Sequence, residues 1–142
     1  MFQQDLIKRA LQRTAEAVAK ALHHKREGEL EDALAEINSA YDEVLRIDRR
    51  TFDVVDSHTL AGLVGAVEQM RSLASLSRVE GEIQEALGRP KLAAARYRRA
   101  LELMLEADER KPADEAGRTA IAELATRVPR DQLMRRYHSR LG

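Results

Sequence analysis

The sequence predicts an all-α fold of about six or seven helices, and three observations lead to that prediction. Alanine, leucine, glutamate and arginine dominate the 142 residues, whereas aromatic residues make up 4% and tryptophan is absent. That composition favours helices. Apolar residues recur at intervals of three and four, and no segment shows the alternation of a half-buried strand. No linker-like segment divides the chain, so we expect residues 1–142 to form a single domain.

The first two predicted helices run from Asp5 to about Glu27 and from Glu29 to about Asp48. Gly28 ends the first of them. A turn this short predicts that the two helices are antiparallel neighbours. The first helix carries an apolar face wider than one neighbour needs, made of Leu6, Ile7, Ala10, Leu11, Ala17, Val18, Ala21 and Leu22. The second has a buried face made of Leu30, Ala33, Leu34, Ile37, Ala40, Tyr41, Val44 and Leu45.

The central part of the chain predicts one short and one long helix. The stretch DRRTFDVVDSHT interrupts the apolar pattern, and a short helix follows over about His58–Val64 with Asp56 or Ser57 as its N-cap. A longer helix is predicted over about Ala66–Leu87. Gly81 lies inside it, where glycine costs up to about 1 kcal/mol relative to alanine. We therefore expect a neighbouring helix to approach closely at Gly81.

Three more helices are predicted in the last part of the chain. Gly88 ends the preceding helix, and Pro90 occupies the first turn of a helix that runs to about Arg110. Shorter helices follow over about Asp114–Arg127 and over Arg130–Arg140, behind Pro129. We expect these last two helices to form an atypical third pair that covers the apolar end of the fold.

A pattern of one glycine, one alanine, one large residue and a second alanine occurs twice at the same spacing. Its first copy is Gly28, Ala33, Ile37 and Ala40, and its second is Gly88, Ala93, Tyr97 and Ala100. Alanines let two helix backbones approach, the large residue fills the neighbouring groove, and the glycine makes the turn. The sequence therefore predicts two antiparallel helix pairs. They are separated by sixty residues because TFDVVDSHTLAGLVG inserts a short helix and its loops.

The second copy, EGEIQEALGRPKLAAARYRRALEL, resembles a tetratricopeptide repeat, and KREGELEDALAEINSAY resembles one more weakly. Ser77 stands at the usual tryptophan position of the second unit, and no proline follows either unit. Most of the chain is also similar to a bacterial family of tetratricopeptide-like proteins without assigned function. That family shares an MF-x-x-D opening, EGELEDAL and a late EG-x-I-x-EA-x-G unit. The resemblance implies antiparallel, tetratricopeptide-like helix pairs, and it does not indicate an activity.

Composition excludes several kinds of protein. Cysteine is absent, which removes disulfides, thiolate metal sites and cysteine nucleophiles. The 24 basic and 24 acidic residues balance, so no overall field attracts nucleic acid or membrane. The uncharged stretches are much shorter than the roughly 20 residues that span a bilayer, and Asp5 precedes any long apolar run, unlike a secretory signal. We expect a cytoplasmic protein that does not enter membranes.

No residue pattern indicates catalysis, a metal site or a cofactor. His23 and His24 are adjacent, so they point about 100° apart on a helix and cannot bind one metal from one face. No H-E-x-x-H or E-x-x-H spacing occurs, and neither a phosphate-binding loop nor a nucleophile elbow is present. We expect ordinary surface histidines, no cofactor and no enzyme activity.

The resemblance implies where a partner would bind. In peptide-binding tetratricopeptide domains, ligands lie on a concave face made by the first helix of each pair. Together with the wide apolar face of the first helix, this predicts a partner surface of Leu11, Ala15, Val18, Leu22, Lys25, Ser75, Arg78 and Glu82. Glu82 stands where the family's carboxylate-binding pattern has asparagine. We therefore expect an apolar or helical segment along Val18 and Leu22 rather than a free carboxylate.

These observations predict a small adaptor or scaffold that binds a peptide or protein, and they leave a homodimer through the first helix open. The charges are segregated, with a basic first and an acidic second helix, which indicates either pairing between neighbours or an arginine-rich surface for an acidic partner. The alternative function is a nucleic-acid-associated helical protein using Arg96, Arg99, Arg135 and Arg136. Nucleic acid is not the expected partner, because acids interrupt the basic clusters and stacking aromatics are missing.

Overall fold

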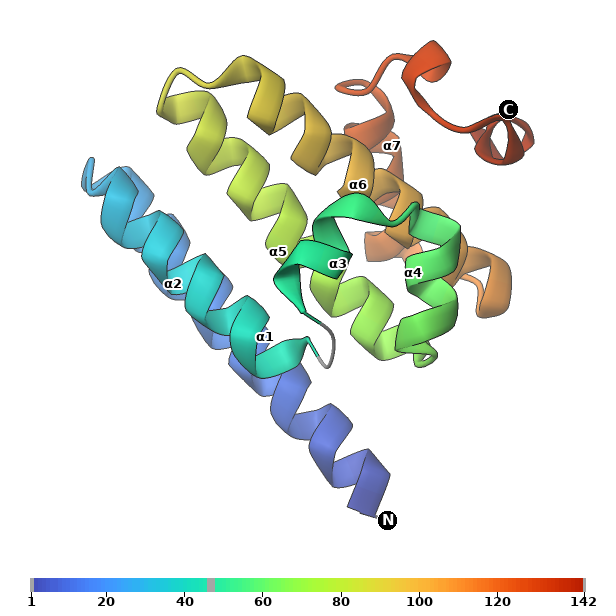
Figure 1. Cartoon of the computed structure of the whole chain (residues 1–142), viewed down its shortest axis with the longest axis horizontal. Coiled ribbons are helices and arrows are strands. Elements are labelled where there is room, and N and C mark those ends of the chain that lie inside the picture. The colour runs from blue at the N-terminus through green and yellow to red at the C-terminus, as the bar shows by residue number, and fades with distance from the viewer. Residues whose placement is uncertain (1, 46–47, 142) are drawn as a thin grey trace.

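The computed structural model describes residues 2–45 and 48–141, and all of their regular secondary structure is helical (Figure 1). The all-α prediction is therefore confirmed. The α-helices are α1 (Phe2–Arg26), α2 (Leu30–Val44), α3 (Arg49–Val54), α4 (Ser57–Val64), α5 (Val67–Ala86), α6 (Pro90–Arg110) and α7 (Glu115–Ala125), followed by the 3₁₀-helices η1 (Arg130–Gln132) and η2 (Arg135–Leu141).

Two antiparallel helix pairs, α1 with α2 and α5 with α6, form the body of the fold (Figure 1). Each pair is closed by a glycine in the left-handed region, Gly28 with φ 77° and Gly88 with φ 75°. An equivalent backbone hydrogen bond closes each of the two turns. Glu29 N–H donates to the carbonyl of His24 over 2.8 Å, and Arg89 N–H donates to that of Gln84 over 2.9 Å. The two copies of the sequence pattern therefore make the same turn.

The small residues of the repeated pattern lie at the helix contacts. Ala33 and Ala40 on α2, like Ala93 and Ala100 on α6, are buried. A Cβ atom added to Gly81 would lie 2.8 Å from two ring carbons of Tyr97, so the close approach expected at this glycine is confirmed. The glycine in the middle of α5 is thus required by packing, which outweighs its unfavourable helix propensity.

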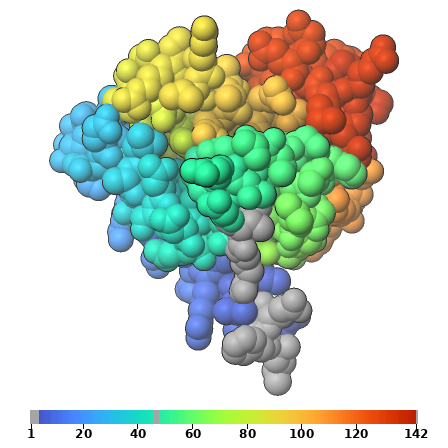
Figure 2. Space-filling model, viewed as in Figure 1, coloured from blue at the N-terminus to red at the C-terminus, as the bar shows by residue number. Residues whose placement is uncertain are grey.

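The connection between the two pairs contains more helix than the sequence predicts. Besides the expected α4, residues Arg49–Val54 form α3, and this segment lies between the two pairs on the face shown in Figure 2. Arg99 of α6 fixes it by donating to the carbonyls of Phe52 and Val55 and to Ser57 Oγ. α2 ends at Val44 rather than near Asp48, because the backbone of Leu45 adopts an extended conformation.

The C-terminal part differs from the prediction. α7 packs on α6 as expected, but the helix predicted over Arg130–Arg140 is wrong, because this segment forms η1 and η2 with an extended residue, Leu133, between them. Leu133 and Tyr137 are both buried in a cluster with residues of α6 and α7. An isolated helix as short as the predicted Arg130–Arg140 is marginal in water. The burial of Leu133 and Tyr137 therefore determines the path of the chain in this segment. The predicted third helix pair is therefore absent from the described residues.

Removing the N-cap of α7 tests how firmly this C-terminal part is held. The Asp114 carboxylate accepts a hydrogen bond from Gly117 N–H over 2.8 Å. We expect Asp114→Ala to lower the free energy of unfolding by about 1 kcal/mol, the usual cost of losing an N-cap. Urea denaturation measures it. Glu115→Ala is the matched control and should change stability by less than about 0.5 kcal/mol; equal effects of the two substitutions would contradict the capping role.

Candidate partner-binding groove

An open and mainly apolar groove of about 530 Å³ runs between α1 and α5. Its α1 wall is a stripe with steps of four, three and four residues, which places its members on one side of the helix. They are Leu11, Ala15, Val18 and Leu22, with Ala19 beside them. Leu11 keeps 40% of its surface exposed. Leu11 and Ala15 are exposed, whereas Val18 and Leu22 are half-buried against the core, so the stripe is only partly covered by neighbouring helices.

Small residues form the contact beneath the groove. Thr14 and Ala17 of α1 and Ser72 of α5 are buried where the two helices pack together. The hydroxyl oxygens of Thr14 and Ser72 have no hydrogen-bond partner in the described structure. Both residues also line the groove. Both oxygens are themselves buried, so their hydrogen-bonding capacity is not used in this structure.

The groove brings together five of the eight residues predicted for the partner surface. These are Leu11, Ala15, Val18, Leu22 and Ser75. Lys25, Arg78 and Glu82 lie outside its lining. Arg78 forms ion pairs with Glu123 of α7 at 2.7 Å and with Glu82 at 3.9 Å. The charges of Arg78 and Glu82 are therefore balanced within the protein.

The charge that lines the groove itself is basic. Of the described lining residues only Arg71 is charged, and its guanidinium donates to the backbone carbonyl of Lys111 rather than to a carboxylate. Lys8 stands three residues before Leu11, and Arg26 stands four residues after Leu22, so helical spacing places both on the same side of α1. Both are exposed. The sequence analysis did not identify Arg71 or Ser72, because their position depends on how the two pairs pack.

Most of the other segregated charges pair within the protein. Arg13 of α1 contacts Glu36 at 2.9 Å and Glu43 at 2.8 Å on α2, which confirms pairing between neighbouring helices. The hydrogen bonds with Glu36 and Glu43 raise the pKa of Arg13. Arg96, named above for nucleic-acid binding, contacts Glu80 at 3.2 Å. The surface available to an anionic polymer is smaller than the arginine count suggests.

Two buried carboxylates on α6 are not predicted by the sequence analysis. Glu102 accepts a hydrogen bond from Ser57 Oγ over 2.7 Å, and Glu106 is 0% exposed. A detectable signal exists, because Arg98, Glu102, Glu106 and Arg110 follow at steps of four and can pair along one side of a helix. The ion pairs Arg98–Glu102 (3.6 Å) and Arg110–Glu106 (2.9 Å) both form.

Glu106 joins α4, α6 and η2. The Tyr137 hydroxyl donates to Glu106 over 2.6 Å, His58 Nδ1 lies 3.2 Å away, and Arg136 Nε lies 3.3 Å away. Burial raises the pKa of the Glu106 carboxyl, but hydrogen bonds from Tyr137, Arg110 and His58 outweigh it and hold the pKa below its ordinary value. Burial and the contact with Glu106 raise the pKa of Tyr137. At neutral pH the negative charge of Glu106 therefore helps to hold the C-terminal segment on α6.

Comparisons with known proteins add no family. No family model, no curated protein and no solved structure matches this chain. Within residues 2–45 and 48–141, every helix is too short or too polar to cross a membrane.

Proposed function

We propose that this protein is a small adaptor that binds a helical segment of a partner protein in the groove between α1 and α5. The observation that carries the proposal is the partly exposed apolar stripe of Leu11, Ala15, Val18 and Leu22, which lines the groove together with Ser75. Contiguous apolar surface that stays exposed marks interaction sites in soluble proteins. The tetratricopeptide resemblance of the sequence implies the same surface.

The basic residues in and beside the groove define the chemistry of the partner. An amphipathic helix buries an apolar stripe in such a groove and leaves its flanks at the rim. Arg71 lines the groove, and helical spacing puts Lys8 and Arg26 on the same side of α1 beyond its two ends. None of the three pairs with a carboxylate among the described ion pairs. Acidic residues on the flank of the partner helix complement these charges and favour one orientation. The proposed ligand is therefore an amphipathic helix with an acidic flank.

The alternatives have less support. A second copy of this chain is the other occupant of the groove, but a second copy presents the same basic α1. Binding of nucleic acid through Arg96, Arg99, Arg135 and Arg136 has to compete with internal contacts, since Arg96 pairs with Glu80, Arg99 donates to backbone carbonyls and Arg136 pairs with Glu106. No arrangement of side chains in the described residues motivates a catalytic proposal.

Site-directed cross-linking tests the proposal. A photoreactive amino acid at Ala15, in the groove, is compared with the same amino acid at Lys20, which is exposed on α1 but outside the groove. We expect a partner segment to cross-link from position 15 and not from position 20. That segment is then made as a peptide, and its affinity for the purified protein is measured by calorimetry.

The affinity measurement shows whether the peptide binds specifically in the groove or nonspecifically to the protein surface. Ala15→Glu places a charge among the apolar side chains and should weaken peptide binding at least about 30-fold, the effect of losing a hot spot of 2 kcal/mol. Lys20→Glu adds the same residue outside the groove and should have little effect. Equal affinities for the two variants contradict the proposal. A dimer in light scattering that Ala15→Glu dissociates identifies a second copy as the occupant instead.

A further inference from the structure

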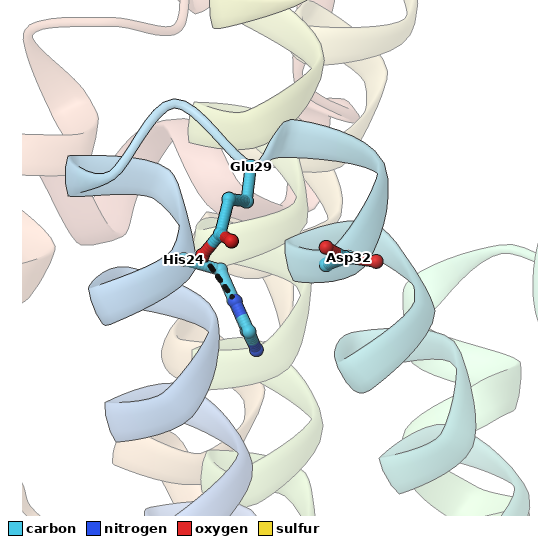
Figure 3. A group of neighbouring side chains, drawn as sticks. All are labelled: His24, Glu29 and Asp32. Atoms are coloured by element: carbon cyan, nitrogen blue, oxygen red, sulfur yellow. Dashed lines mark hydrogen bonds and ion pairs between the residues drawn. The ribbon is translucent and has the colours of Figure 1, made fainter.

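His24, Glu29 and Asp32 bring three metal-ligating groups together at the turn between α1 and α2 (Figure 3). His24 Nδ1 lies 3.0 Å from Glu29 Oε1. One ligand atom of each residue lies within 4.8 Å of the other two. Two ligands of a tetrahedral zinc ion stand about 3.3 Å apart, as bond lengths near 2 Å require. Small side-chain rotations are therefore sufficient for all three groups to reach one ion.

The backbone keeps these side chains near one another. Gly28 makes the turn with φ 77°, and Glu29 N–H donates to the His24 carbonyl over 2.8 Å, so the two ligand-bearing residues are joined by a main-chain hydrogen bond. Glu29 is the N-cap residue of α2 and Asp32 lies in the first turn of that helix, so both carboxylates stand at the same end of α2. The group therefore does not depend on a flexible loop.

Helix capping does not account for the two carboxylates. Glu29 occupies the N-cap position of α2, but its side chain makes no capping hydrogen bond and instead contacts His24. Within the described residues, no hydrogen bond or ion pair involves the Asp32 side chain. Glu31, by contrast, lies 3.7 Å from Arg89 in an ion pair. Two exposed carboxylates and a half-buried imidazole thus lie within reach of one another, and none of them contacts an arginine or lysine among the described ion pairs.

We propose that His24, Glu29 and Asp32 form a binding site for a divalent transition-metal ion, with Zn²⁺ as the probe. One imidazole nitrogen and two carboxylate oxygens suit zinc, whereas calcium takes six to eight oxygen ligands. A neutral imidazole and two carboxylates also balance the charge of a divalent ion. Three protein ligands leave further coordination positions to water. The ion would link the end of α1 to the start of α2, a role separate from the groove.

The helical spacings considered in the sequence analysis do not detect this site. They place every ligand on one helix. Here the three ligands follow an H-x4-E-x2-D pattern that crosses the glycine turn between two helices. His23 points away from its neighbour along the helix and does not belong to the group. His23 and Glu31 therefore serve as matched controls, one next to each kind of ligand.

Titration of the whole protein with Zn²⁺ tests the site. Calorimetry should show one saturable site per chain, and His24→Ala or Asp32→Asn should weaken it at least about tenfold, since even outer-shell partners of metal ligands contribute that much. His23→Ala and Glu31→Gln should leave the affinity within about twofold of the original value. Circular dichroism checks that each variant keeps its helix content.

Two results overturn the proposal. One is the absence of saturable Zn²⁺ binding at millimolar concentrations. The other is binding that all four variants weaken equally, which indicates a diffuse attraction to exposed acids. Histidine NMR provides an independent readout, because a bound diamagnetic zinc ion should shift the imidazole signals of His24 and leave those of His58 and His138 in place.

Discussion

Replacing Tyr97 by alanine is expected to lower the free energy of unfolding by about 3–5 kcal/mol, the range for removing a buried aromatic side chain. Tyr97 is 3% exposed, packs in a cluster with Leu124 and Val128, and accepts a hydrogen bond from Arg127 over 3.1 Å. It therefore connects α5, α6 and the segment around α7. Chemical denaturation measures the loss. Tyr97→Phe removes only the hydroxyl and should cost about 1 kcal/mol.

The contact between Tyr97 and Gly81 gives this prediction a second test. In the natural background Gly81→Ala should destabilise by about 1 kcal/mol, because overpacking costs about 1–3 kcal/mol and better helix propensity returns up to about 1. With Tyr97→Ala present, the ring is gone, and Gly81→Ala should stabilise. Gly62→Ala is the control, since a Cβ there meets no atom within 4 Å. Independent, additive effects at positions 81 and 97 would contradict the packing described here.

Replacing Glu106 by alanine is expected to cost about 3 kcal/mol, near the lower end for breaking a buried ion pair. The lower end applies because Arg110 and Arg136 are partly exposed and regain some hydration. The loss should concentrate at the C-terminal segment, which hydrogen exchange can localise through the amides of η2 and α7. Glu109→Ala removes an exposed acid from the same helix and should change stability by less than about 0.5 kcal/mol.

The same residue predicts a dependence on pH. The folded state holds the pKa of Glu106 below its ordinary value of 4.5, so the unfolded chain binds this proton more readily. The contribution of Glu106 is therefore complete above about pH 4.5 and is lost as the pH falls through the folded-state value. The difference in unfolding free energy between the natural protein and Glu106→Gln should shrink on acidification. A difference that stays constant from pH 7 to pH 3 would contradict the assignment.

The sequence predicts most of the fold because its strongest signals are local. Gly28 and Gly88 each stop a helix, and the alanines on either side of Ile37 and Tyr97 specify where the paired helices touch. α3 and the 3₁₀ path after Pro129 are not predicted. Short segments like these have too little propensity of their own, and contacts distant in sequence, such as those of Arg99 and Tyr137, decide their conformation.

For a similar reason, the sequence predicts the α1 side of the candidate groove but only part of its α5 side. The stripe on α1 follows from helical spacing alone, whereas Arg71 and Ser72 join it only through the packing of α5 against α1. The burial of Glu106 escapes prediction because a carboxylate in a charged stretch normally faces water, and only its position between arginines at steps of four indicates otherwise. The His24 group requires the geometry of the turn, which no single-helix pattern contains.

The packing of the C-terminal residues gives the molecule two unlike ends. α7 and η2 fold back onto α6, with Tyr137 anchored to Glu106, and occupy the surface on which another helical hairpin could be stacked. At the opposite end, α1 packs mainly against α2 and α5 within the described residues, and part of its apolar stripe lines the open groove. A further helical hairpin therefore cannot stack on this part of α6 unless α7 and η2 are displaced, whereas the groove side of α1 is not covered in this way.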